Sequence, residues 1–449
     1  MSITGRVPLL AALGALAVGL LLPSLTGVLA VNLLLLLAIV CDLLLAAPVR
    51  ELLFTRSGDT TVRVGEEALV DVVVINRGSR PLRSRIRDAW PPSALPDGGE
   101  RHGNEPSSDA DQAVLTPRQV LTVPPRGRRA FTTRLRPSRR GDHHAGPLIV
   151  RSFGPLGLAA RQGRHHVGWT VRALPPFAGR RHLPAKLARL RGLDGRTTML
   201  GRGQGTEFDS LRSYLPGDDT RSIDWRATAR LTDVAVRVWR PERDRQLLIV
   251  LDTGRTAAAR VGDAPRLDAF MDAALLLASL AVRAGDRVDL MAYDREVRAL
   301  VRGHHARDAL PTLINALAPL EAALVETDAR GLAMAALKNA LPGTLIVLLT
   351  SLDAPALEEG LLPVLPLVTH RRGVLLAAVS DPRVDVMAES RGDAAAVYEA
   401  AAALGAQSER QAMTEQLRRH GVTVVDAPPA AIGPAVADAY LTMKRTGRL

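Results

Sequence analysis

Two apolar runs at the N-terminus constrain the architecture of this chain more than any other feature. Residues 7–22 contain only apolar and small residues, and residues 25–47 form a second run that only Asn32 and Asp42 interrupt. A membrane-spanning helix needs about 20 apolar residues, with roughly 17 as the lower limit. The second run meets this length, and the first reaches it if it extends past Arg6 while that side chain snorkels to the interface. We therefore predict a transmembrane helical hairpin within residues 1–50.

The flanking charges predict how this hairpin is oriented. A secretory signal peptide is the competing interpretation, but a second apolar run that follows with no polar gap disfavours it. Arg6 precedes the first run, Arg50 and Arg56 follow the second, and the connection between the runs is uncharged. Because positive charge stays on the cytoplasmic side, both ends are expected in the cytoplasm. The sequence thus predicts a multi-pass protein of the plasma (inner) membrane with cytoplasmic soluble domains. Asp42 is expected within reach of interfacial water.

The middle of the chain has the alternation of period two that is typical of strands. A β-branched run at 68–75 is followed by a turn at 76–78, and further strands are expected at 60–64, 120–123, 129–135, 148–153 and 167–174. Residues 91–117 are rich in Pro, Gly, Ser and Asp and are expected to form a long loop. This pattern predicts an all-β, sandwich-like domain over residues 57–175.

The last two hundred residues alternate between continuous apolar strands and helices. Strands are expected at 247–251, 287–293, 344–350, 373–380 and 422–425, with an edge strand at 296–301. Helices are expected at 264–284, 306–318, 329–341, 354–369 and 394–420, with a last one ending near 444. Such a succession predicts a parallel sheet covered on both faces, which is an α/β domain over residues 241–445. In this fold class ligands bind at the carboxyl ends of the strands.

Composition excludes several classes of function. The net charge is 58 − 46 = +12, but arginine is so uniformly preferred over lysine that we expect no dedicated basic patch. The 14 aromatic residues leave little for base stacking, so no nucleic-acid partner is predicted. Cys41 is the only cysteine, which excludes an intrachain disulfide and a multi-cysteine zinc site.

Residues 176–240 link the two soluble domains and contain a segment dense in charged and glycine residues. No Gly-Lys-Ser/Thr follows its glycines, and the segment does not sit between a strand and a helix, so no nucleotide is predicted. The favoured interpretation is that its charges pair with one another and clamp the two domains together; the alternative is an exposed docking surface. The residues of interest are Glu207, Phe208, Arg212, Tyr214, Gly217, Asp218, Asp219, Arg221, Asp224, Trp225 and Arg230.

This segment closely resembles the signature of the domain-of-unknown-function family 58, in which Glu207-Phe208, Gly217-Asp218-Asp219 and Asp224-Trp225 occupy fixed spacings. The resemblance implies a membrane hairpin, a β-rich domain and a C-terminal von Willebrand factor A-like domain. The family has no established activity. Its members are thought to work beside MoxR-type AAA+ ATPases, so the resemblance implies a membrane-bound adaptor with such a partner.

A complete von Willebrand type A domain binds Mg²⁺ through an Asp-x-Ser-x-Ser loop, a Thr and a second Asp, and oxygen ligands suit this ion. Here Asp252 and Thr256 match the first loop, Gly254 replaces its middle Ser, Thr327 could supply the second hydroxyl, and Asp353 is displaced by two positions. The predicted site, Asp252, Thr256, Thr327 and Asp353, is therefore degenerate, and no cofactor is expected.

Catalytic constellations are not apparent. The histidines of the α/β domain do not follow strand ends, and no His-Glu-x-x-His motif occurs. The sequence thus predicts a membrane-anchored, non-enzymatic scaffold whose von Willebrand A-like domain docks a protein. The alternative is a metal-dependent adhesion or hydrolase-like module that uses the degenerate site.

Overall fold

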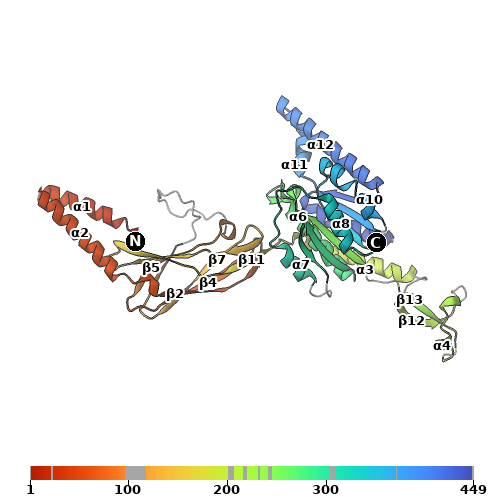
Figure 1. Ribbon diagram of the computed structural model, residues 1–449, viewed down its shortest axis with the longest axis horizontal. Helices are drawn as coiled ribbons and strands as arrows, with labels where there is room; N and C mark the ends of the chain where they lie inside the picture. Colours follow the sequence, from red (N-terminus) through yellow and green to blue (C-terminus); the bar gives the residue numbers. More distant parts are fainter. Residues whose placement is uncertain are drawn as a thin grey trace. The chain divides into compact units, whose positions relative to one another are not determined.

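The computed structural model describes residues 2–21, 24–96, 118–200, 207–215, 220–230, 233–240, 245–303, 309–370 and 372–446. The chain divides into two compact units, Met1–Pro176 and Phe177–Leu449. The first contains the N-terminal helices and a β-rich region, and the second contains an α/β region (Figure 1). The predicted succession of apolar, β-rich and α/β parts is confirmed.

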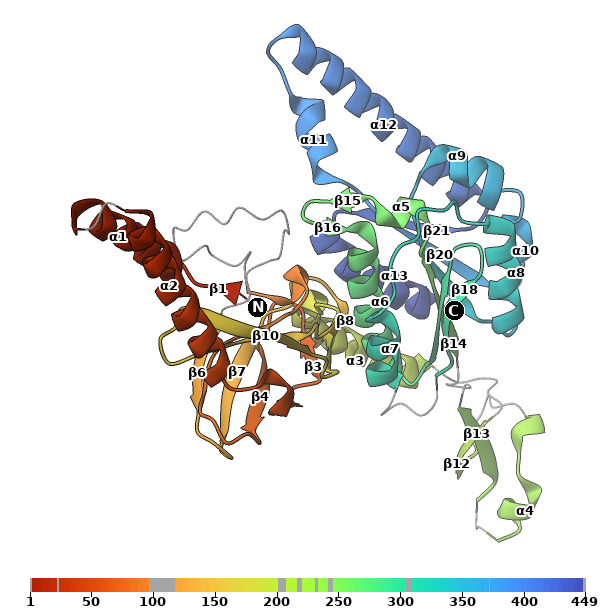
Figure 2. The ribbon, with the colours of Figure 1, turned by 60° about the vertical axis from the view of Figure 1, so that its left-hand side comes forward.

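The N-terminal helices lie side by side. Helix α1 spans Arg6–Leu21 and helix α2 spans Leu25–Leu45 (Figure 2). A side chain at Gly14 would place its Cβ 2.5 Å from Val31 Cγ1, so the close approach of the helices requires a glycine there. Within the described residues, α2 is the helix that is long and apolar enough to cross a membrane, whereas α1 is a shorter apolar helix. That both helices cross the membrane stays a prediction.

Three sheets form the β-rich region. Five strands follow the order β1-β10-β9-β5-β6, and two three-stranded sheets follow the orders β2-β4-β7 and β3-β11-β8. The strands are β1 (Ser2–Ile3), β2 (Leu52–Gly58), β3 (Thr61–Arg63), β4 (Ala68–Asn76), β5 (Leu82–Asp88), β6 (Arg118–Val123), β7 (Arg128–Leu135), β8 (Gly141–His144), β9 (Leu148–Phe153), β10 (Ala159–His165) and β11 (Thr170–Leu174).

Alternating residues of these strands build the core. Val72 and Val74 of β4 are buried in one cluster with Leu82 and Ile86 of β5, so the sheets that contain β4 and β5 pack face to face. Five strands, β1, β2, β5, β8 and β10, are absent from the sequence prediction. Strand β1 has only two residues, and charged or polar residues within β2, β5, β8 and β10 hide the apolar alternation.

The α/β region contains a six-stranded sheet in the order β18-β17-β14-β19-β20-β21. Its strands are β14 (Gln246–Asp252), β17 (Arg287–Tyr293), β18 (Val297–Val301), β19 (Leu345–Leu349), β20 (Gly373–Val379) and β21 (Thr423–Ala427). All neighbouring strands are parallel except β17 and β18, which form the predicted edge hairpin. The chain runs from β14 to β17 on one side and returns to β19 on the other. The carboxyl ends of β14 and β19 therefore flank the switch point where such sheets bind ligands.

Helices α6 (Arg266–Arg283), α7 (Ala309–Leu317), α8 (Ala329–Asn339), α12 (Ala394–Arg419) and α13 (Pro429–Thr446) accompany this sheet. The helix predicted at 354–369 is wrong as one element. It is broken into α9 (Ala354–Ala356), a π-helical turn at Leu357–Leu361 and α10 (Leu365–Thr369), because Pro355, Pro363 and Pro366 interrupt it.

An additional helix, α11 (Pro382–Glu389), was not predicted. It starts directly after the carboxyl end of β20 and pairs with α12 to form a helical arm (Figure 2). Asp381 caps its first turn by accepting a hydrogen bond from Arg383 N. The arm carries several exposed apolar side chains, namely Val386, Met387, Val397, Tyr398 and Leu404.

Candidate functional site: the carboxyl edge of the α/β sheet

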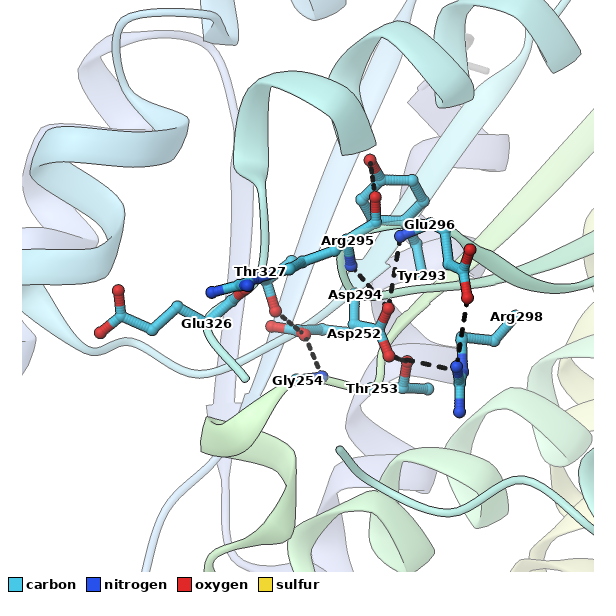
Figure 3. Close-up of polar contacts among 10 residues, drawn as sticks. All are labelled: Asp252, Thr253, Gly254, Tyr293, Asp294, Arg295, Glu296, Arg298, Glu326 and Thr327. Atoms are coloured by element: carbon cyan, nitrogen blue, oxygen red, sulfur yellow. Dashed lines mark hydrogen bonds and ion pairs between the residues drawn. The ribbon is translucent and has the colours of Figure 1, made fainter. Parts of the chain in front are cut away.

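Asp252 lies at the centre of the carboxyl edge, where β14 ends. Its side chain is buried and accepts three hydrogen bonds, of which Figure 3 shows those from Thr327 and Gly254. Oδ1 accepts from Thr327 Oγ1 at 2.5 Å and from Gly254 N at 2.9 Å, and Oδ2 accepts from Thr350 Oγ1 at 2.6 Å. Both carboxylate oxygens are therefore engaged by the protein itself, and donors of three segments converge on one charge.

Gly254 explains how Thr327 reaches this carboxylate. A Cβ at position 254 would lie 2.1 Å from Thr327 Oγ1 and 3.0 Å from the Val325 carbonyl oxygen. The threonine hydroxyl thus occupies space that a side chain at position 254 would need. The glycine that interrupts the Asp-x-Ser-x-Ser pattern is consequently part of a different, internally bonded arrangement.

Backbone hydrogen bonds connect the loop that leads into α8 to the residues that follow β14 and β17. Thr253 accepts a hydrogen bond from Ala323 N at 2.7 Å, and Arg255 N donates to the Val325 carbonyl at 2.8 Å. At the surface Arg255 and Glu326 form an ion pair of 3.0 Å in which both side chains are exposed. Backbone hydrogen bonds therefore fix the loops of this edge, and the charged side chains of Arg255 and Glu326 project from it into solvent.

Asp294 braces the neighbouring strand end. Its Oδ1 accepts from Arg295 N at 2.6 Å, while Arg298 approaches Oδ2 at 3.5 Å (Figure 3). Tyr293 Oη donates to the Arg295 carbonyl at 3.3 Å. Burial raises the pKa of the Tyr293 hydroxyl, and the nearby carboxylates of Asp328 and Asp294 raise it further. The phenol therefore stays protonated and acts as a hydrogen-bond donor.

The four predicted metal ligands do not form one group of contacts. Of the four, only Asp252 and Thr327 share a hydrogen bond in the described part of the chain. The Thr256 carbonyl instead accepts from Arg266 Nη1 at 2.9 Å, and Asp353 acts on Arg266 through its charge. Burial lowers the pKa of Arg266, whereas Asp353 acts in the opposite direction. The predicted metal site included neither Thr350, which binds Asp252 directly, nor Arg266.

The signature residues lie mainly on a small β-hairpin. Strands β12 (Glu207–Ser213) and β13 (Ala235–Arg240) pair antiparallel, and α4 (Trp225–Thr228) follows a cap at Asp224. Asp224 accepts from Arg226 N and Ala227 N, both at 3.0 Å, and from Arg237 Nε at 2.8 Å. These bonds lower the pKa of Asp224, with the Ala227 N–H first among the causes. The ion-pair partner of Asp224 is thus Arg237, which was not among the residues predicted to pair, and the predicted pairing within the segment stays a prediction.

Other signature residues have less defined roles. Glu207, Phe208 and Arg212 lie on β12, and Tyr214 N donates to the Val234 carbonyl at 2.7 Å. Trp225 is 69% exposed, and Arg221 and Arg230 are also exposed. Gly217, Asp218 and Asp219 lie outside the described residues. The clamp between the domains stays a prediction.

Asp42 differs from its expectation. It was expected to reach interfacial water, but its side chain is fully buried at the end of α2. Its carboxylate accepts from Leu156 N at 2.8 Å, Leu158 N at 2.7 Å and Ala159 N at 2.9 Å. The loop between β9 and β10 therefore replaces water as its hydrogen-bond donor, a long-range contact that the sequence pattern does not reveal.

Comparison with known protein families gives a match for part of the second unit. Residues 210–388 match the family model described as "Protein of unknown function DUF58". The predicted resemblance is confirmed over this stretch, which runs from β12 to α11 and includes the whole neighbourhood of Asp252.

Curated relatives match about a quarter of the chain. The uncharacterized protein YeaD of Bacillus subtilis is 24% identical over 113 residues, which is 25% of this chain and 28% of the relative. The uncharacterized protein Rv1480 of Mycobacterium tuberculosis is 26% identical over 118 residues, which is 26% of this chain and 37% of the relative. The chain thus spans between 28% and 37% of the length of these relatives.

Solved structures resemble the chain only weakly. The CARDB domain of the PF1109 protein from Pyrococcus furiosus, solved in complex with di-metal ions, has a TM-score of 0.19 and 12% identity; the match covers 29% of this chain and 91% of that domain. The ASH/PapD-like domain of human CEP192 has a TM-score of 0.17 and 11% identity, over 27% of this chain and 84% of that one. Scores this low define no shared fold.

Proposed function

We propose that this protein is a membrane-anchored, non-enzymatic scaffold that receives a protein partner at the carboxyl edge of its α/β region. The partner class implied by the family resemblance is a MoxR-type AAA+ ATPase. In this proposal the α/β region is von Willebrand factor A-like, both N-terminal helices cross the plasma membrane, and both soluble regions are cytoplasmic.

One observation carries the proposal, namely that both oxygens of the buried Asp252 carboxylate accept hydrogen bonds from the protein itself, from Thr327, Thr350 and Gly254. A scaffold needs an edge of fixed shape, and three internal hydrogen bonds on one buried charge provide it. A metal-dependent docking edge would instead need these oxygens to face an ion and its remaining ligands.

Two surfaces at this edge suit contact with a protein. The Arg255–Glu326 pair projects from the loop beside Asp252, and the arm formed by α11 and α12 starts at the carboxyl end of β20. Exposed Val386 and Tyr398 give this arm apolar area of the kind that marks interaction sites.

The alternative function is a metal-dependent adhesion or hydrolase-like module that uses Asp252, Thr256, Thr327 and Asp353. For this function Thr256 and Asp353, which lie beside Arg266, would have to join Asp252 and Thr327 around one ion. The observed contacts support this alternative less well than the metal-free scaffold.

Affinity pull-down of the full chain from native membranes separates these functions. We expect an AAA+ ATPase to be recovered equally with and without EDTA. The double variant Arg255→Glu/Glu326→Arg should abolish recovery, because it inverts the surface charges while it keeps an ion pair at the same place.

A matched control is Glu67→Arg/Arg134→Glu, which swaps two exposed charges of the β-rich region. This control should leave recovery unchanged. Loss of the ATPase in EDTA would contradict the metal-free scaffold. Unchanged recovery with the rim variant would contradict docking at this edge.

A further inference from the structure

The outer face of the five-stranded sheet in the first unit carries a cluster of arginines. In β5 the residues Leu82, Ser84 and Ile86 are buried, so the alternate positions point outward. The described arginine side chains on this face are Arg83, Arg85, Arg87, Arg151 and Arg164, and all but the half-buried Arg87 are exposed. We call this set the arginine face.

Strand register brings these charges together. Arg85 of β5 lies directly opposite Arg151 of β9, and Arg151 lies opposite Gln162 of β10. Opposite side chains on antiparallel strands have Cβ atoms about 5 Å apart. Like charges at that distance destabilise a sheet. Folding alone therefore does not account for the arrangement, whereas an anionic partner would relieve it.

The other outward positions contain no carboxylate. Across β5, β6, β9 and β10 the described outward side chains besides the arginines are Val120, Thr122, Ile149, Phe153, Ala160 and Gln162. Val120 is 73% exposed beside Arg85, and the Arg85 guanidinium lies 5.9 Å from the centre of the Phe153 ring. The face thus combines positive charge with apolar side chains, a combination suited to a membrane surface.

The arginine face begins at the base of the membrane helix. Arg83 Nη1 donates to the Pro155 carbonyl at 3.4 Å, and Pro155 adjoins Leu156, whose N–H binds Asp42 of α2. Two more arginines contact the same junction: Arg6 Nη1 donates to the Leu156 carbonyl at 3.2 Å, and Arg80 donates to the Leu44 carbonyl. The sheet is therefore joined to α2 through buried hydrogen bonds and stays next to any bilayer that α2 crosses.

We propose that the arginine face binds anionic phospholipid headgroups of the bilayer in which α2 is embedded. This inference rests on the proposed membrane anchoring, and adds a second, electrostatic contact to it. Anionic lipids of the cytoplasmic leaflet attract juxtamembrane arginines, and each arginine near the surface strengthens binding about fivefold. The contact would orient the β-rich region on the membrane surface.

Lipid retention tests the inference on the full chain. The protein is purified in mixed micelles with equal amounts of phosphatidylglycerol and phosphatidylcholine, and the lipids that remain bound are quantified by mass spectrometry. We expect enrichment of phosphatidylglycerol that decreases with salt. The triple variant Arg83→Gln/Arg85→Gln/Arg151→Gln should reduce this enrichment at least about fivefold, the effect expected for one arginine.

Matched variants separate the face from net charge. Arg330→Gln/Arg418→Gln/Arg419→Gln removes three exposed arginines of the α/β region and should retain the enrichment, as should the Lys-for-Arg triple at positions 83, 85 and 151. Equal loss in the α/β control, or no enrichment in the unaltered protein, would overturn the inference. Binding of an RNA oligonucleotide that needs the face, without lipid enrichment, would overturn it in favour of nucleic acid.

Membrane fractionation of the same variants tests separately whether the protein is anchored in the membrane. All variants should remain in the membrane fraction because α2 is unchanged. Absence of the unaltered protein from that fraction would defeat the proposed anchoring itself. Retention there without phosphatidylglycerol enrichment would defeat only the role of the arginine face.

Discussion

Two buried aspartates, Asp42 at the end of α2 and Asp252 at the carboxyl end of β14, accept hydrogen bonds from different kinds of donor. Asp42 accepts three hydrogen bonds from backbone N–H groups, whose direction is fixed. Asp252 accepts one from backbone and two from threonine hydroxyls, which can rotate and can also accept. Position 42 therefore tolerates only hydrogen-bond acceptors. At position 252 the threonine hydroxyls can reorient around a substituted side chain.

The largest effect is expected for Asp42→Asn. The amide nitrogen cannot accept, so at least one of the three backbone N–H groups would lose its partner and the charge-assisted strength of the others would fall. We expect a loss of about 3 kcal/mol in the free energy of unfolding of the first unit. Thermal unfolding of the full chain in detergent measures it.

Cys41→Ala is the matched control for this prediction, because Cys41 is the adjacent, exposed residue of α2. It should leave the unfolding temperature nearly unchanged. Equal stability of Asp42→Asn and Cys41→Ala would show that the contact between α2 and the β9–β10 loop does not stabilise the fold.

Asp252→Asn should cost less, about 1–2 kcal/mol. The amide oxygen can still accept from Gly254 N, and the amide nitrogen can donate to a threonine hydroxyl that turns to accept. Chemical denaturation measures the free energy of unfolding of the second unit. Asp263→Asn, at an exposed position, serves as the control. A larger loss than for Asp42→Asn would reverse the comparison.

Gly254→Ser tests the space beside Asp252. The added Cβ would collide with Thr327 Oγ1, and overpacking of this kind costs typically about 1–3 kcal/mol. We expect a loss within that range, because Thr327 Oγ1 must move and the Val325 backbone carbonyl, 3.0 Å from the added Cβ, must also shift slightly. Thr327→Ala in the same chain should recover part of it, and a double-mutant cycle measures the coupling. Additive effects would show that the two positions do not compete for space.

A third aspartate, Asp272 of α6, extends the comparison to a carboxylate with few donors. The Gly179 N–H reaches its two oxygens at 2.9 and 3.1 Å, and the Ala178 N–H also donates to this carboxylate. Burial raises its pKa above the ordinary 3.8, although the Gly179 N–H acts in the opposite direction. Ionisation thus opposes folding, and the resulting destabilisation develops as pH rises from the unfolded-state pKa through the raised folded-state pKa.

Asp272→Asn should therefore give the smallest effect, a slight stabilisation at neutral pH that disappears near pH 3. Parallel thermal unfolding of both proteins across this pH range measures the difference. Destabilisation at neutral pH would mean that the Asp272 charge is favourable in the folded state.

The sequence predicts the α/β sheet better than the β-rich region, for a physical reason. Strands such as β14 and β19 are buried on both faces and contain only apolar residues apart from their ends, so their pattern is unmistakable. Strand β5 alternates arginine with buried residues, and this alternation from Arg83 to Arg87 was the available signal for both the strand and the arginine face. The uniform use of arginine along the chain concealed it.

The candidate site was predictable only in part. Asp252 was identified by its position after a strand and Thr327 by comparison with the von Willebrand type A metal site, and the two are in contact. Thr350 forms the other contact, but its partner is 98 residues away and only the strand order reveals it. Likewise, the donors to Asp42 are backbone groups more than 110 residues away, which no side-chain pattern can indicate.

The magnesium dependence of unfolding tests the central claim, a carboxyl edge that holds its shape without a metal, most directly. The thermal unfolding of the full chain is followed in EDTA and across a magnesium titration, with Asp252→Asn alongside. We predict no saturable change in the unfolding temperature. A functional site at 100 times its dissociation constant would add about 2.7 kcal/mol of stability. A saturable rise of that size, absent in Asp252→Asn, would contradict the metal-free scaffold.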